Sequence, residues 1–265
     1  MRKTLKQFFK EFIIFTGKQA QASIFGALLL LTIIITKWIN FSDLPLTRYD
    51  VIFLTAIFIQ FILIATKAES KEEIKVIFLF HILATIMELF KTNPKINSWQ
   101  YPGQRGIFML GTVPLFTGFL YSSVGSYIAR AWRIFKLSFT NLPTQKHLLI
   151  LSTLIYLNFF THHFIPDFRL FLFISTIIIF RKSIVHFTMI NTPRSMPLLL
   201  GLALITFFLY LAENIGTYMK VWLYPNQAST WHLVRFGKYG SWFLLIVISF
   251  TLISMIYRTS KTKKY

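Results

Sequence analysis

Apolar runs of membrane-spanning length recur along the chain, and they constrain its fold more than any other feature. A transmembrane helix needs about 20 predominantly apolar residues. Eight candidate runs occur, and the segments between them are too short for a soluble domain. We therefore expect an all-α protein, a polytopic transmembrane helical bundle. The expected spans are residues 22–39, 50–66, 74–92, 106–129, 147–164, 168–185, 197–216 and 238–257.

The composition supports a membrane protein and excludes other classes. Of the 265 residues, 55% are apolar and 14% are charged, while the net charge is +19. The Lys and Arg residues lie mostly between the apolar runs, so topology and anionic headgroups explain them better than nucleic acid does. We expect the lipid bilayer as partner and no nucleic acid. Because the chain has no Cys, disulfides, thiolate nucleophiles and Cys-ligated metals are excluded.

The basic residues also predict the orientation of the spans. With the N-terminus inside, the inner segments hold 19 of the 28 Lys and Arg residues, as the positive-inside rule expects. Eight spans then place both termini in the cytoplasm of a multi-pass plasma-membrane protein. Residues 1–21 gather Leu5, Phe9 and Phe12 on one helical face, which predicts an amphipathic interfacial helix or one that docks on a partner. Residues 258–265 form a basic cytoplasmic tail.

Two segments about half a chain apart have nearly the same pattern. Residues 88–102 have the sequence ELFKTNPKINSWQYP, and residues 213–225 have ENIGTYMKVWLYP. Each has a Glu near the end of an apolar run, followed by Trp-x-Tyr-Pro. The repeat predicts two four-helix halves, residues 22–129 and 130–257. Because each half has an even number of spans, the halves are expected to run parallel rather than inverted.

The two repeated acids, Glu88 and Glu213, are the first candidates for function. A carboxylate within an apolar run is costly in lipid and by default indicates a functional position. Two carboxylates in a poorly hydrated site do not both ionise easily, so one can act as an acid and the other as a base. The alternative is a structural role at a helix end, in which Glu88 pairs with Lys91 and Glu213 caps loop backbone.

Other polar and aromatic side chains are expected near the same membrane face. His162 reaches a similar depth and Asp167 follows it, so both are expected to tune the acid–base pair. Because His162 and His163 are adjacent, they are not expected to point inward together. The repeated Trp and Tyr residues form either an interfacial aromatic belt or the wall of a cavity. The substrate-binding candidates are His81, Trp99, Tyr101, Asn158, Arg169, Asn214, Trp222 and Tyr224.

No particular cofactor follows from the residues. His162 and carboxylates are suitable metal ligands in type, but neither HExxH nor HxxxH occurs, and we predict no metal site. No phosphate-binding Gly-rich loop with Lys is present, which argues against ATP-driven work. His81 lies two turns before Glu88, where it either lines the same cavity or packs as a hydrogen-bonded core side chain. The small residues within 106–129 favour close helix packing.

The combined motifs resemble those of the YoaT-like family of bacterial membrane proteins. The similar segments are MELFKTNPKINSWQYPG, PLFTGFLYSSVGSYIARAW, LNFFTHH, LAENIGTYMKVWLYPNQ and KYGSW, and they cover nearly the whole chain from about residue 50. The resemblance implies a bacterial plasma-membrane protein and brings no substrate. One departure is Gly103, which stands where the pattern is expected to have an acid.

A second, partial resemblance is to membrane-embedded carotenoid cyclases and hydratases. These have a Glu followed by Gly and then Trp or Tyr near the lipid interface. Residues 213–216, ENIG, before Trp222 and Tyr224 are similar to that pattern, whereas the first half of the chain has no matching Gly. The resemblance implies a protonated Glu that donates to an alkene while aromatic rings shield a carbocation.

The leading hypothesis is an intramembrane acid–base enzyme or binder that acts on an apolar or lipid molecule through Glu88 and Glu213. The alternative is a proton- or cation-coupled transporter or channel for a small solute, with the same acids as ion sites. A transporter needs polar residues through the inner half of the membrane. This sequence concentrates them toward the outer face, which favours the first hypothesis. The oligomeric state is left open.

Overall fold

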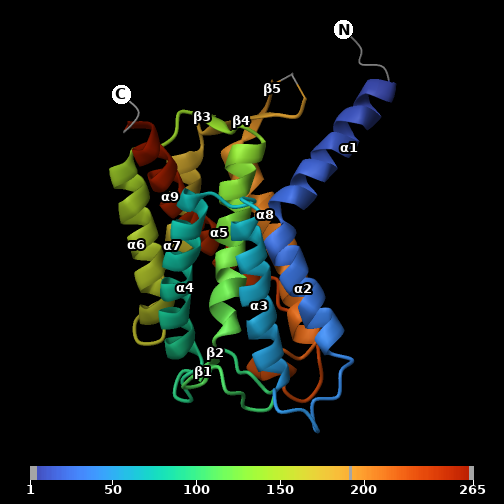
Figure 1. The fold of residues 1–265 in the computed structure, drawn as a ribbon. Coiled ribbons are helices and arrows are strands. Elements are labelled where there is room, and N and C mark those ends of the chain that lie inside the picture. The colour runs from blue at the N-terminus through green and yellow to red at the C-terminus, as the bar shows by residue number, and fades with distance from the viewer. Residues whose placement is uncertain (1–4, 191–192, 263–265) are drawn as a thin grey trace.

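The computed structural model describes residues 5–190 and 193–262, which fold mainly into helices (Figure 1). In these ranges nine α-helices and one short 3₁₀ helix, Pro225–Gln227, are joined by loops and five short strands. The start of α1 and the end of α9 lie at the same end of the bundle. The helices are α1 Leu5–Ala22, α2 Ile24–Thr36, α3 Arg48–Ala65, α4 Lys71–Lys91, α5 Phe116–Ile134, α6 Gln145–Thr161, α7 Arg169–Phe180, α8 Leu198–Tyr218 and α9 Gly237–Thr262.

Each predicted span overlaps one helix of the series α2 to α9, but the bounds differ, most of all at the start of α5. α5 begins at Phe116 rather than at residue 106, because the chain first makes a hairpin with Gly111 at φ +59°. α7 has only 12 residues and ends at Phe180, after which the chain forms a strand. Apolar composition alone did not separate these extended segments from the adjoining helices.

Several helices are long and apolar enough to cross a membrane. In the described ranges they are α3, α8 and Gly237–Tyr257 of α9. Phe9–Ala22 and Ile24–Thr36 qualify together as a fourth span with a bend of 71°. Length and composition therefore support three or four of the eight predicted spans.

The fold is mostly helical, as expected, and two small antiparallel sheets accompany the helices. β1 Met109–Leu110 pairs with β2 Val113–Pro114. At the opposite end of the bundle, β4 Ile184–Thr188 pairs with β3 Ser138–Thr140 on one side and β5 Pro193–Pro197 on the other (Figure 1). The β4 sequence IVHFT is β-branched and aromatic, which favours a strand once the helix has ended.

Helix α1 is fastened to the larger sheet at this end. Glu11 forms an ion pair of 2.9 Å with Arg194 of β5, and Lys18 Nζ donates to the carbonyl of Thr188 at 2.8 Å. Phe12 and Ile13 remain 57% and 68% exposed. An exposed apolar face beside the end of a bundle suits the predicted interfacial role, which stays a prediction.

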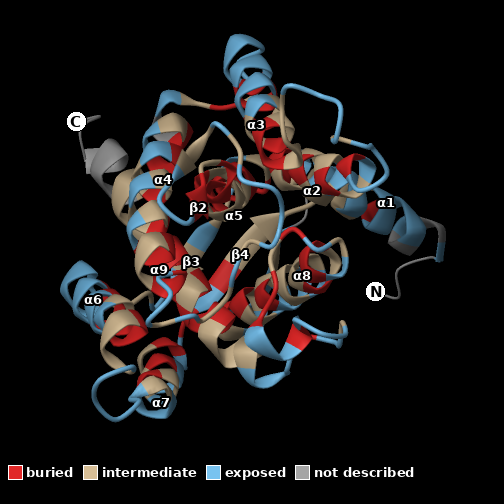
Figure 2. Ribbon diagram, turned by 90° about the horizontal axis from the view of Figure 1, so that it is seen from below, coloured by how far each residue is buried: buried red, intermediate tan, exposed pale blue. Residues whose placement is uncertain are grey.

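Helix α5 lies inside the bundle and packs closely on α4 (Figure 2). A Cβ added at Gly118 would lie 2.3 Å from Nδ1 of His81, and one added at Gly125 would lie 3.0 Å from the Phe80 ring. The small residues of α5 thus allow the close approach that the sequence predicted. Packing against α5 also fixes the face on which α4 presents Glu88.

Two other buried acids serve the starts of helices. Asp50 accepts from the backbone N–H of Thr47 at 3.0 Å at the start of α3. Glu73 accepts from that of Ser70 at 2.6 Å at the start of α4, and it pairs with Arg133 at 3.1 Å. These capping boxes satisfy backbone donors that the helix itself leaves unpaired. Glu88 and Glu213 lie instead near the ends of α4 and α8, where helix capping does not account for them.

Candidate functional site

A cavity of about 1000 Å³ runs through the bundle, and both repeated acids line it. Its volume is at the upper end of the usual range for small-molecule sites. Away from the acids the lining is mostly apolar and reaches Phe12 and Phe15 of α1. The repeated aromatic side chains also line this cavity: Trp99, Tyr101, Trp222 and Tyr224.

The Glu88 carboxyl group is held by three neutral donors. Trp99 Nε1 and Tyr101 OH donate to Oε2 at 2.9 and 2.7 Å, and Tyr121 OH of α5 donates to Oε1 at 2.9 Å. Only 2% of Glu88 is exposed. The alternative in which Glu88 pairs with Lys91 is not observed, because the Lys91 side chain contacts histidines instead.

The Glu213 carboxyl group repeats this arrangement at the end of α8. Trp222 Nε1 and Tyr224 OH donate to Oε1 at 2.7 and 2.6 Å. Gly216 makes room for the indole, because an added Cβ would lie 2.1 Å from the Trp222 ring. The donors are side chains rather than loop backbone, so the alternative of a backbone cap is not observed. Asn214 takes that role, since its Oδ1 accepts from the Val234 backbone at 2.9 Å.

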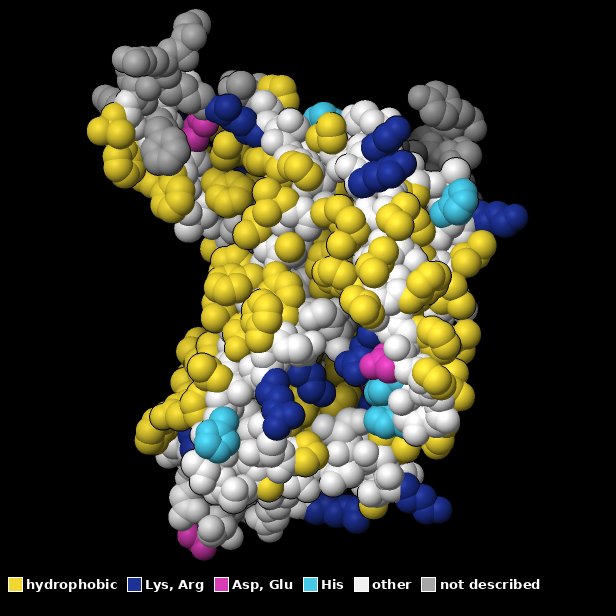
Figure 3. Space-filling view, turned by 180° about the vertical axis from the view of Figure 1, so that it is seen from behind, with side chains coloured by type: hydrophobic (Ala, Val, Ile, Leu, Met, Phe, Trp, Pro, Cys, Tyr) yellow, Lys and Arg dark blue, Asp and Glu magenta, His cyan; other side chains and the backbone are white. Residues whose placement is uncertain are grey.

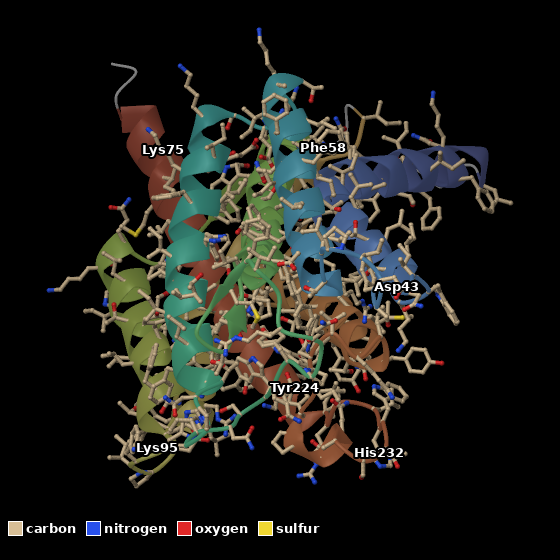
Figure 4. All side chains as sticks on the ribbon, turned by 60° about the horizontal axis from the view of Figure 1, so that its bottom comes forward. Asp43, Phe58, Lys75, Lys95, Tyr224 and His232 are labelled. Carbon is tan, nitrogen blue, oxygen red and sulfur yellow. The ribbon has the colours of Figure 1, made fainter. Side chains whose placement is uncertain are left out.

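The two Trp-x-Tyr segments also pair with each other. Gln100 and Leu223, the middle residues, exchange backbone hydrogen bonds of 2.9 Å in an antiparallel bridge. Figure 4 places Tyr224 near the middle of this end of the molecule, between the loops that carry Lys95 and His232. The bridge therefore holds the two acids and their donors over one end of the cavity.

Gly103, where the sequence pattern led us to expect an acid, makes close contacts that require a glycine. Its backbone N–H donates to Tyr49 OH at 2.8 Å, and the same hydroxyl donates to the carbonyl of Val221 at 2.9 Å. A Cβ at this position would lie 2.7 Å from the Tyr49 ring. Tyr49 thus ties together the loops that follow α4 and α8, and a side chain at residue 103 would displace it.

The loop tyrosines are hydrogen-bond donors rather than bases. Burial raises the pKa of Tyr101 and of Tyr224 well above 10, and the neighbouring Glu in each case raises it further. Both hydroxyls are therefore protonated at neutral pH. A protonated phenol beside each carboxyl group can pass a proton but does not itself add charge.

Lys91 meets both histidines that follow α6. Its Nζ lies 3.4 Å from His162 Nε2 and 2.9 Å from His163 Nε2. His162 lines the cavity, whereas His163 contacts Lys91 from outside the lining, so the two imidazoles do not both face the cavity. His162 Nδ1 donates to the carbonyl of Asn158 at 2.7 Å, so its Nε2 is left as an acceptor facing Lys91.

Asp167 binds Arg169 and does not line the cavity. The Arg169 Nε donates to Asp167 at 2.6 Å, and Nη1 donates to Ser241 of α9 at 2.9 Å. Partial burial opposes ionisation of Asp167, but hydrogen bonds from Arg169 and Asn158 outweigh it and lower the pKa to about 2. Asp167 is therefore an ionised anchor that orients Arg169.

The predicted residues thus divide into two groups. Glu88, Glu213, His162, Arg169 and the four loop aromatics line the cavity. The others make structural contacts outside its lining: His81 packs on Gly118 and Phe119, Asp167 holds Arg169, Asn158 joins the α6–α7 turn, and Asn214 holds the loop after α8.

Three cavity residues escaped the sequence argument. Tyr121 completes the Glu88 network, although it lies in a helix that the sequence indicated only for packing. Lys91 and Lys238 also line the cavity, whereas the sequence indicated Lys91 only as a possible partner of Glu88 and did not single out Lys238. Lys238 Nζ lies 4.3 Å from the centre of the Tyr224 ring. Proximity to the repeated motif was the available signal for Lys91, while Lys238 is remote from it in sequence.

Comparison with known proteins identifies the family. Residues 11–250 match the family model described as "Protein of unknown function (DUF817)". The chain belongs to the DUF817 family. It is also 38% identical over 247 residues to "Uncharacterized protein YoaT" of Bacillus subtilis (strain 168), covering 93% of this chain and 92% of that protein. The predicted family is therefore confirmed, and no solved structure matches the chain.

Proposed function

We propose that this DUF817 protein is a multi-pass membrane protein that binds an apolar or lipid molecule in its central cavity and uses Glu88 and Glu213 as an acid–base pair. In this proposal all eight helices α2 to α9 cross or enter the membrane, and both termini are cytoplasmic. The shorter helices complete the bundle around the spans that qualify by length. The repeated loops then face the extracytoplasmic side.

The matching contacts of the two acids support duplicated halves. Each Glu accepts from a Trp and a Tyr of the loop that follows, with separations of 11 and 13 residues for Glu88 and of 9 and 11 for Glu213. Their middle residues pair with each other in an antiparallel bridge. Mutual pairing of equivalent residues is what a twofold axis produces. Two parallel repeats related by an axis along the membrane normal fit this geometry.

The observation that carries the functional proposal is the presence of both carboxyl groups, bound by neutral donors, on one largely apolar cavity. In such surroundings a carboxyl group is easily kept protonated, and two of them favour unequal protonation. One can then give a proton to an alkene or carbonyl group of a bound molecule. The other can remove a proton from a neighbouring carbon, so that the reaction is proton-neutral and needs no oxidant.

Conservative Glu→Gln variants test this role. We expect Glu88→Gln and Glu213→Gln to abolish the change that expression of the protein causes in the lipid extract of its host, while expression and Tm stay close to wild type. Glu69→Gln is the matched control, because Glu69 is also a buried acid but accepts from Ser126 at 2.7 Å outside the cavity lining. If both Gln variants give the wild-type lipid profile, the acid–base role fails.

A transporter is the second candidate, because the cavity extends from the acids to α1 near the opposite end of the bundle. The inner part of the lining is mostly apolar, however. The buried acids at that end lie outside the lining, where Glu69 accepts from Ser126 and Glu73 pairs with Arg133. A transporter predicts proton or solute flux into liposomes that Glu88→Gln abolishes. Absence of flux alongside lipid turnover favours the enzyme.

A further inference from the structure

Three cations from separate helices gather on one side of the cavity. Lys91 ends α4, Arg169 begins α7 and Lys238 lies at the start of α9, and all three line the cavity beside His162. From behind, the surface shows a hollow whose rim carries Lys or Arg side chains, with His and acidic side-chain atoms next to them (Figure 3). The acids of the repeat face the same cavity, but in the described ranges no ion pair joins them to these cations.

In the described ranges, two of the three cations form no ion pair. Arg169 is paired with Asp167. Lys91 has imidazole nitrogens as partners, and Lys238 lies over the rings of Tyr224 and Trp99, 4.3 and 6.0 Å from their centres. Lys91 is only 4% exposed. Burial with neutral hydrogen-bond partners disfavours the charged form of a lysine, and a bound anion stabilises that form.

Beyond this rim the cavity continues as an apolar space. Its lining passes Leu209 and Phe208 of α8 and Leu30 of α2 on the way to α1. The combination of clustered cations at one end and an apolar wall along the rest matches one chemical class, a molecule with an anionic head and an apolar chain. Arg and Lys together suit a phosphate or carboxylate group. The Arg guanidinium donates two parallel hydrogen bonds to such a group, and the Lys ammonium group adds a compact positive charge.

We propose that Lys91, Arg169 and Lys238 bind the phosphate or carboxylate head of an amphiphile whose apolar chain fills the cavity. This inference rests on the proposed function, since it names the class of molecule that the cavity accepts. Asp167 positions Arg169 for this contact, and His162 positions Lys91. The head then lies near Glu88 and Glu213, so chemistry occurs at the first carbons of the chain.

Binding of single-chain probes to the purified full-length protein in a nonionic detergent tests the inference. The probes are dodecyl phosphate, dodecanoate, dodecanol and inorganic phosphate, followed by native mass spectrometry. We expect one anionic chain to bind at least tenfold more tightly than dodecanol. Lys91→Gln and Lys238→Gln should each reduce that preference about tenfold, the scale of one charge-assisted hydrogen bond. Lys95→Gln, an exposed lysine outside the cavity lining, should leave it unchanged.

The four probes and the variants distinguish a failure of the head site from a failure of the proposed function. Equal binding of dodecyl phosphate and dodecanol, unaffected by Lys238→Gln, overturns the head site and leaves the apolar cavity intact. Binding of no chain at all overturns the proposed function as well. Inorganic phosphate that binds as tightly as dodecyl phosphate overturns the amphiphile and leaves a free anion as ligand. Because Lys91→Gln alters a buried group, Tm is measured for each variant, and the partly exposed Lys238 provides the independent test.

Discussion

Gly216→Ala should destabilise the protein by separating Trp222 from Glu213. The added Cβ would lie 2.1 Å from the indole, which is far below a van der Waals contact. Overpacking costs about 1–3 kcal/mol, and loss of a hydrogen bond to a buried acceptor costs about 1–3 kcal/mol. Ala recovers about 1 kcal/mol of helix propensity. The net loss of about 1–5 kcal/mol corresponds to a fall in Tm of roughly 2–20 °C for a chain of this size.

A second glycine of the same helix provides the control. At Gly201 the nearest atom to an added Cβ is 3.7 Å away, which is an ordinary contact. Gly201→Ala should therefore leave Tm unchanged or raise it. Thermal unfolding in detergent, followed by tryptophan fluorescence, compares the two variants. In the Trp222→Ala background, Gly216→Ala should no longer be destabilising; equal Tm shifts for the two glycine variants in the wild-type background would refute the packing argument.

Three further predictions follow from the loops and the turn after α6. Gln100→Cys combined with Leu223→Cys should form a disulfide, because directly paired Cα atoms of this kind lie about 5.5 Å apart. The double variant should then migrate differently on gels with and without reductant, and an uncrosslinked double variant would contradict the pairing. Reporter fusions after residues 100 and 225 should be extracytoplasmic and a fusion at 265 cytoplasmic, and a cytoplasmic reporter at 100 would invert the topology. Partial desolvation and then Lys91 lower the pKa of His163 from 6.5 to about 4, so protonation favours the unfolded state and stability should fall as pH drops from about 6.5 to 4. His163→Gln should flatten that part of a Tm-against-pH curve, and an unchanged slope would remove His163 as its cause.

The positions of the helices were largely predictable from sequence. Each of the eight apolar runs overlaps a helix, because burial in lipid or protein selects the same long apolar segments. The strand β4 was missed because IVHFT has only five residues, the first two of which fell within the predicted span 168–185. In a short apolar segment, composition does not distinguish a strand from a helix. Here pairing with β3 and β5 makes the segment a strand.

The candidate site was predictable only where the two halves repeat. Glu88 and Glu213 were found with the Trp and Tyr that bind them, because the same spacing occurs twice. Tyr121 was missed because its contact with Glu88 depends on the packing of α5 against α4.

Polar residues without a repeat were harder to assign. Asn158 and Asn214 both stabilise loop backbone, a role that a sequence cannot distinguish from substrate contact. Lys238 joins the site through the fold, since 150 residues of other helices and loops separate it from Glu88. The cation cluster therefore became visible only in three dimensions.

Native mass spectrometry of the protein purified from bacterial membranes tests the central claim most directly. Ala212 lines the cavity on α8, whereas its neighbour Leu211 is 41% exposed and lies outside the lining. We predict one bound amphiphile in the wild type and in Leu211→Trp, and its loss in Ala212→Trp, whose indole fills the cavity. A wild-type protein free of bound lipid, or an Ala212→Trp variant that retains it, would contradict a lipid-binding cavity between Glu88 and Glu213.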